Sequence, residues 1–149
     1  MRTTSRQRSA SHEPLSCCRA TCDVAAAFRT AVETVASLGH IMKKTAVPFA
    51  GPATGIGHIE RDRKTIGGQL FAEIDVLLLP TTMSTVPRTA AAVPNAQALS
   101  PENTAFANYY GLPAMSVPCG FDSSGLPVGL QIVAGPWADL NVLALARQY

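Results

Sequence analysis

The chain has 149 residues, of which 47% are apolar and 15% are charged, and its formal net charge is +2. These proportions are typical of one soluble globular domain or of a piece of a larger one. No apolar run reaches the roughly 20 residues of a membrane-spanning helix. A charge of +2 with few lysines gives no electrostatic surface for nucleic acid. We therefore expect neither a membrane nor a nucleic acid as a partner.

The cysteines and histidines show no pattern of a metal site. Three of the four cysteines crowd into a polar N-terminal stretch and the fourth lies far along the chain, while the three histidines occur singly. This spacing favours neither a disulfide framework nor zinc. We predict reduced thiols, no metal and no cofactor, as in a cytoplasmic protein.

Residues 1–22 are rich in Arg, Ser and Thr, contain one acidic residue and show no apolar periodicity. We interpret them as a disordered N-terminal leader. Organelle transit peptides have a similar composition, but an amphipathic stripe, which such peptides carry, is not evident here.

Residues 23–49 are predicted to form a helix followed by a strand. Apolar residues recur at three- and four-residue steps from Val24 to Leu38, which is typical of one helix face. Asp23 is expected to cap this helix and Gly39 to end it in the left-handed conformation. Residues 40–47 then alternate loosely up to a proline, as in a short strand.

Residues 50–70 are expected to be a junction. The glycines and proline of residues 49–57 favour a loop. Residues 59–71 are compatible with a helix, although Gly67 and Gly68 each weaken it by about 1 kcal/mol relative to alanine.

The succession of apolar residues from Ile74 to Leu79 predicts a strand covered on both faces, ended by Pro80. A long irregular connection is expected over residues 81–99. A serine and a proline at 100–101 then open a helix that Gly111 closes.

Residues 113–119 and 128–134 are predicted to pair as a hairpin, because the run Asp122-Ser123-Ser124-Gly125 between them has the composition of a tight turn. A last helix is expected to begin with Asp139 as its cap. It carries the apolar residues Leu140, Leu143 and Ala144.

The residues alone offer few catalytic candidates. Ser123 and Ser124 lie in the predicted turn, where a hydroxyl usually bonds the local backbone. Ser116 lies in an apolar strand and is expected to be buried with a satisfied hydroxyl. Cys119 lacks an electropositive setting, and Asp75 is better explained as a structural partner than as a general base.

An ordered series of short matches links residues 71–149 to a known family. The matched features are Asp75 to Pro80 with Thr81 and Thr82, Asn103-Thr104, Asn108, Gly111-Leu112-Pro113, Ser116-Val117-Pro118, Gly120-Phe121 and the run from Gly125 to Gln131. In these features the segment resembles the C-terminal part of amidase-signature hydrolases, a family that includes one component of the glutamyl-tRNA amidotransferase. Residues 23–49 resemble a helix and strand of the same family. Because a long stretch separates the two regions in the family, the chain looks internally shortened.

The resemblance implies an α/β fold, with a partial mixed β-sheet flanked by helices. The domain is then residues 23–149, divided into the helix–strand unit 23–49, the shortened junction 50–70 and the C-terminal segment 71–149. Its unmatched strand edges predict marginal solubility and self-association.

The resemblance also implies hydrolysis of a carbon–nitrogen amide bond in a small molecule. The family uses a serine nucleophile, a bridging serine, a lysine and a Gly/Ser-rich loop. That loop is missing from this sequence, and the contexts of Lys43, Lys44 and Lys64 do not match the family lysine. We therefore assign no catalytic residue and expect a chain that is inactive alone. The alternative is a non-catalytic interaction module that complements a separately encoded N-terminal half.

Three residues are candidates for substrate binding. The resemblance implies that the loop of Thr81 and Thr82 and the helix that carries Asn108 form one wall of the acyl pocket. For each of them, packing is the competing interpretation.

Overall fold

The structure is a computed structural model that describes residues 8–11, 21–47, 56–94 and 99–149. Strands from these ranges form a five-stranded sheet in the order β2-β1-β3-β5-β4. The strands are β1 (Arg8–Ser11), β2 (Ile41–Lys44), β3 (Val76–Pro80), β4 (Ala114–Phe121) and β5 (Pro127–Ala134). The strands β2, β1 and β3 run parallel, whereas β5 is antiparallel to both β3 and β4. The predicted mixed sheet is confirmed.

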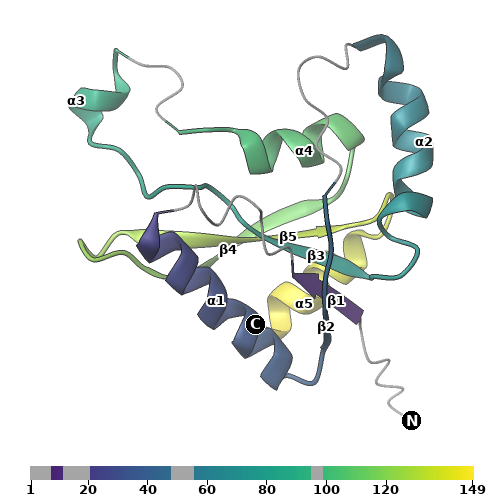
Figure 1. Ribbon diagram of the computed structural model, residues 1–149, viewed down its shortest axis with the longest axis horizontal. Helices are drawn as coiled ribbons and strands as arrows, with labels where there is room; N and C mark the ends of the chain where they lie inside the picture. Colours follow the sequence, from purple (N-terminus) through teal and green to yellow (C-terminus); the bar gives the residue numbers. More distant parts are fainter. Residues whose placement is uncertain (1–7, 12–20, 48–55, 95–98) are drawn as a thin grey trace.

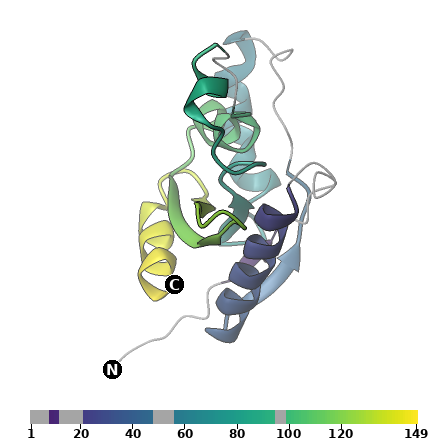
Figure 2. The ribbon, with the colours of Figure 1, turned by 90° about the vertical axis from the view of Figure 1, so that its left-hand side faces the viewer.

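Helices cover both faces of this sheet, as Figures 1 and 2 show. The helices of the described residues are α1 (Cys22–Ser37), the 3-10 helix η2 (Ile56–His58), α2 (Ile59–Gln69), α3 (Thr89–Ala92), α4 (Glu102–Tyr110) and α5 (Asp139–Gln148). Buried side chains of α1 and α5 pack on one face, and those of α2 and α4 pack on the other. The result is a three-layer α/β arrangement.

Strand β3 joins the two hydrophobic clusters. All of its residues are buried, with Val76 and Leu78 facing α1 and α5, and Leu77 and Leu79 facing α2 and α4. Successive side chains of a strand point to opposite faces, so a run without polar residues is what a strand covered twice requires. Each such side chain stabilises the fold by about 1.5–3 kcal/mol. The predicted two-sided burial is confirmed.

Strand β1 differs from the expectation of a disordered leader over residues 1–22. Arg8 to Ser11 lie between β2 and β3, with Arg8 beside Ile41 and Ser9 beside Val76. The sequence of these four residues shows no apolar alternation, so it did not indicate a strand. Their pairing with β2 and β3 uses backbone N–H and C=O groups, which every sequence provides. Thr21 and Cys22 also depart from the expectation, because they are the N-cap and the first residue of α1 (Cys22–Ser37). The rest of it, on residues 1–7 and 12–20, lies outside the described residues.

Several predicted helix and strand ends are confirmed. Gly39 and Gly111 follow α1 and α4 with φ of 92° and 65°, the left-handed values that glycine adopts freely. The strand β2 lies within residues 40–47, α2 lies within residues 59–71, and β4 and β5 form the predicted hairpin. The short helix α3 lies in the connection predicted to be irregular, and residues 48–55 of the predicted loop lie outside the described residues.

Asp23 does not cap α1 as predicted. The N-cap residue is Thr21, and the Asp23 carboxylate accepts hydrogen bonds from the Ser123 amide (3.0 Å) and the Ser123 hydroxyl (2.8 Å). These bonds, chiefly the one from the amide, hold the pKa of Asp23 below its usual value. Ser123 therefore ties the β4–β5 turn to α1 instead of bonding its own turn with its hydroxyl.

The last helix, α5, begins where predicted, but the face that packs against the sheet is not the predicted one. Val142 and Leu145 are buried against the sheet, whereas Leu140 and Leu143 are 79% and 50% exposed. The N-cap of α5 is Ala138, not Asp139. In the described ranges, no helix is long and apolar enough to cross a membrane.

Candidate substrate-binding site

Two hydroxyl groups meet across β5 at the centre of the candidate site. Thr81 directly follows β3, and its amide donates to the carbonyl of Gly129 at 2.8 Å. The Thr81 Oγ1 and Ser116 Oγ atoms are hydrogen-bonded at 2.6 Å. Ser116 is exposed on β4, so its predicted burial is wrong, although its hydroxyl is satisfied.

Gly129 makes this meeting possible. A Cβ atom at position 129 would lie 2.7 Å from Thr81 Oγ1 and 2.8 Å from Ser116 Oγ, closer than real Cβ contacts allow. Because glycine has no side chain, hydroxyls from the strand ends on either side can bond over the β5 backbone.

Two hollows adjoin the hydroxyl pair, and both are lined by Thr81 and Ser116. The first has a volume of about 230 Å³ and is completed by Thr104, Ala107, Asn108, Ala114, Met115 and Gln131. The second has a volume of about 290 Å³ and is completed by Thr82, Val117, Pro118, Pro127, Val128 and Gly129.

The structure thus brings the three predicted residues to one place. Thr81 lines both hollows, Asn108 lines the first and Thr82 lines the second. The Thr82 hydroxyl donates to the Ser84 carbonyl at 2.7 Å, which fixes the loop after β3. Substrate binding by these residues stays a prediction.

A buried pair of amides fixes the wall of the first hollow. Asn103 and Gln131 are 4% and 3% exposed, and they are the buried polar residues of the described ranges. Asn103 Nδ2 donates to the Pro80 carbonyl at 2.6 Å, and Gln131 Nε2 donates to the Asn103 carbonyl at 3.1 Å. These bonds hold α4 on β3 and β5, because a buried amide left unpaired is costly.

Both amides belong to matched motifs, although neither residue was predicted to have a role. A signal was present, because Gln131 interrupts the apolar run of β5 between Leu130 and Ile132. A polar residue on a strand buried on both faces indicates an internal hydrogen-bond partner.

The described side chains that line the hollows can form hydrogen bonds, but none of them is basic enough to remove a proton from a serine hydroxyl. Their described lining contains no Asp, Glu, Lys, Arg, His or Cys. Lys43 pairs with Glu73 on the surface, and Lys64 lies on α2 away from this site. Burial raises the pKa of the nearby Cys119 thiol to about 11, so this thiol is protonated at neutral pH, in line with the prediction that it is unreactive.

No metal centre is found where the structure can be described, since no group of three or more His, Cys, Asp or Glu side chains gathers there. Cys22 and Cys119 are free cysteines. Cys17 and Cys18 lie outside the described residues. The polar side chains that line the two hollows carry hydroxyl and amide groups.

Comparison with known proteins decides the ancestry of this scaffold. The family model Amidase matches residues 57–143, which is more than half of the chain. The chain belongs to the amidase family. This family match contains every residue of the two hollows and of the amide pair.

Curated relatives within the amidase family match the chain over similar lengths. A fatty acid amide hydrolase of Medicago truncatula is 38% identical over 85 residues, which is 52% of this chain and 14% of the relative. The glutamyl-tRNA(Gln) amidotransferase component of Synechococcus sp. (strain CC9311) is 44% identical over 93 residues, which is 61% of this chain and 18% of the relative. The chain thus spans less than a fifth of these amidases.

The solved structure of the corresponding glutamyl-tRNA(Gln) amidotransferase component from Thermotoga maritima has a similar fold. Its TM-score is 0.73 at 23% identity, and the match covers 97% of this chain and 42% of that one. The structural match therefore extends to residues before the family match begins at residue 57. The amidase-family fold is confirmed.

Proposed function

We propose that this chain forms a substrate-facing wall of an amidase that hydrolyses a carbon–nitrogen bond of a small-molecule amide, and that it is inactive alone. The observation that supports this proposal is the Thr81–Ser116 hydroxyl pair between two hollows, which are lined by Thr82 and Asn108 as well. Hydroxyl and amide side chains of this kind can orient an amide by hydrogen bonds to its carbonyl and N–H groups.

The expected inactivity follows from what amide cleavage needs. A serine must lose its proton to a base, and backbone amides must stabilise the oxyanion that forms. Ser116 shares its hydroxyl with Thr81, and neither hollow has a base in its described lining. Removing the base together with the oxyanion donors eliminates nearly all of the rate enhancement of such an enzyme.

The test is an assay of the purified chain against three amides: a fatty acid amide, glutamine and an aryl amide. We expect no hydrolysis above that of the double variant Thr81→Ala/Ser116→Ala. Turnover that disappears in the Ser116→Ala variant alone would refute the inactivity and make Ser116 the nucleophile. Circular dichroism of each variant shows whether the fold is retained.

The alternative function is that of a non-catalytic module that completes an amidase with a separately encoded N-terminal half. Its support is that the chain covers 42% of the Thermotoga maritima protein with a TM-score of 0.73. In addition, β4 forms one edge of the described sheet, and an edge strand presents N–H and C=O groups that another strand can bind.

Co-expression with the N-terminal part of an amidase tests this alternative. We expect a stable complex and amide hydrolysis that neither chain shows alone. A matched control uses the same N-terminal part with its catalytic lysine replaced by alanine, which should bind but not hydrolyse. Absence of a complex would refute the interaction role. The proposal that the chain forms a substrate-facing wall would then be tested by measuring whether the chain binds an amide.

A further inference from the structure

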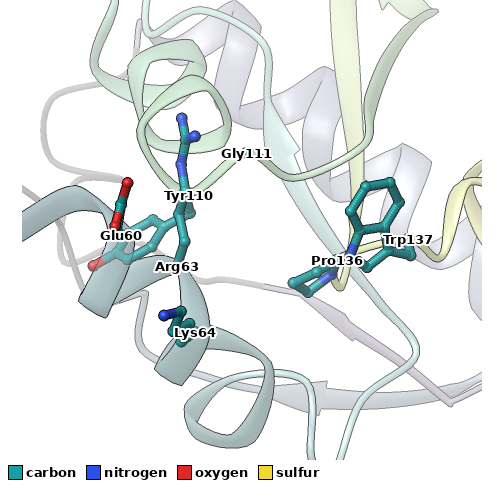
Figure 3. A pocket seen from close by; sticks show the side chains of 7 residues that line it. All are labelled: Glu60, Arg63, Lys64, Tyr110, Gly111, Pro136 and Trp137. Atoms are coloured by element: carbon teal, nitrogen blue, oxygen red, sulfur yellow. The ribbon is translucent and has the colours of Figure 1, made fainter.

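A larger hollow lies at the opposite end of β5, between α2, the end of α4 and the turn after β5 (Figure 3). Its volume is about 610 Å³, and it is lined by Glu60, Arg63, Lys64, Tyr110, Gly111, Pro136 and Trp137. It shares no lining residue with the hollows at Thr81. The proposed amidase function does not use it.

Trp137 forms one wall of this hollow in an unusual conformation. It is the single tryptophan of the chain, it is 95% exposed, and its φ is 65°. A bulky residue is strained in this left-handed region, which glycine adopts without cost. Backbone strain at an exposed aromatic residue suggests a role in binding instead of in packing.

The facing wall carries two cations on α2 (Figure 3). The Arg63 guanidinium is fixed, because Nε donates to the Tyr109 carbonyl at 2.8 Å and Nη2 donates to the Asn108 carbonyl at 3.0 Å. Lys64 is exposed and forms no ion pair with any residue that the structure describes. Glu60 is the one carboxylate among the lining residues that the structure describes, so this part of the wall has a net positive charge.

We propose that this hollow binds a small aromatic carboxylate. The ring of the ligand stacks on Trp137, and its carboxylate lies toward Lys64 and Arg63. The volume lies within the roughly 300–1,000 Å³ of small-molecule sites. Hydrogen bonds from a cation to a carboxylate are stronger than those between neutral groups, and an exposed indole offers a flat face for stacking.

Because Trp137 is the single tryptophan, its fluorescence reports on this hollow directly. Benzoate is the probe, and benzamide is its neutral counterpart of nearly the same shape. We expect a saturable change of tryptophan emission with benzoate and about tenfold weaker binding of benzamide, as the loss of a charged hydrogen bond predicts. Lys64→Gln should weaken benzoate binding about tenfold and leave benzamide binding unchanged.

The matched control is Lys44→Gln, which removes a lysine of β2 outside the hollow and should leave benzoate binding unchanged. Trp137→Ala, followed by calorimetry because the fluorophore is gone, should abolish binding, whereas Trp137→Phe should retain most of it. Both substituted side chains are exposed, so the fold should survive these changes. Equal affinities for benzoate and benzamide, an unchanged Lys64→Gln variant, or no saturable change with benzoate would each overturn the proposal.

Discussion

Replacing Gly129 by alanine tests how the hydroxyl pair of the candidate site is built. The new Cβ would lie 2.7 Å from Thr81 Oγ1, 2.8 Å from Ser116 Oγ and 3.1 Å from Thr81 Cβ. Atoms do not stay at such distances, so the two hydroxyls must separate and their 2.6 Å hydrogen bond must lengthen or break. Gly129→Ala is therefore expected to destabilise the fold.

The size of this effect follows from three contributions. Crowding a packed position costs about 1–3 kcal/mol, and loss of a hydrogen bond costs about 1 kcal/mol. Replacing a glycine also lowers the conformational entropy of the unfolded chain, which stabilises the folded state by about 0.4–1 kcal/mol. Because both hydroxyls end short side chains that can rotate, we expect a net loss near the middle of this range, about 2 kcal/mol.

Urea unfolding followed by circular dichroism measures this change. Gly57→Ala is the control, because a Cβ at position 57 would meet no atom within 4 Å. In a chain that already carries Ser116→Ala, the Gly129→Ala substitution should cost less, since one of the two close contacts is gone. Equal stability of the Gly129→Ala and Gly57→Ala variants would refute this account of the site.

Three further predictions concern the amide pair, an ion and a thiol. Asn103→Ala should destabilise the fold by about 1–3 kcal/mol in urea unfolding, because it removes the donor that pairs a buried carbonyl; a neutral result would contradict that role. Since its folded-state pKa is lowered, Asp23 should stabilise the fold fully above about pH 3.8 and lose this effect as the pH falls through the lower value, so the stability difference from Asp23→Ala should shrink in acid. A difference that grows in acid would reverse the sign assigned to the Ser123 contact. With a pKa of about 11, Cys119 should be alkylated by iodoacetamide at neutral pH more slowly than the exposed Cys22, as peptide mass spectrometry can show.

Local chemistry made parts of the fold predictable. Gly39 and Gly111 end helices because both positions need a left-handed backbone. The β4–β5 turn follows from Asp122, whose side chain accepts bonds from the amides of Ser124 and Leu126. These features depend on neighbours within a few residues, so the sequence displays them directly.

Features that depend on contacts between distant residues were harder to predict from the sequence. The helix α5 has apolar residues on two faces, with Leu140 and Leu143 on one and Val142 and Leu145 on the other. Periodicity alone therefore does not determine which face packs, and the sheet selects the second. The bond between Ser123 and Asp23 joins residues a hundred positions apart, which no local pattern indicates.

The residues of the candidate site were predicted from the family resemblance more than from the physical properties of the sequence. Thr81, Thr82 and Asn108 came from matched motifs, and the structure places them around two adjoining hollows. Ser116 was expected inside an apolar strand, but β4 is an edge strand whose side chains alternate toward solvent. The side of a strand that faces solvent depends on the sheet order, which the sequence did not reveal.

The order of strands in the sheet has a consequence for biosynthesis. Among the described strands, β1 and β2 come first in the chain, yet each has four residues, and a two-stranded ribbon of that length is not stable by itself. The partner of β3 on its other side is β5, which ends at Ala134, and the hydrophobic cluster that both strands share includes Leu145 of α5. The core of this sheet therefore cannot close before Leu145 has left the ribosome, and a chain that lacks residues 135–149 should be degraded instead of accumulating.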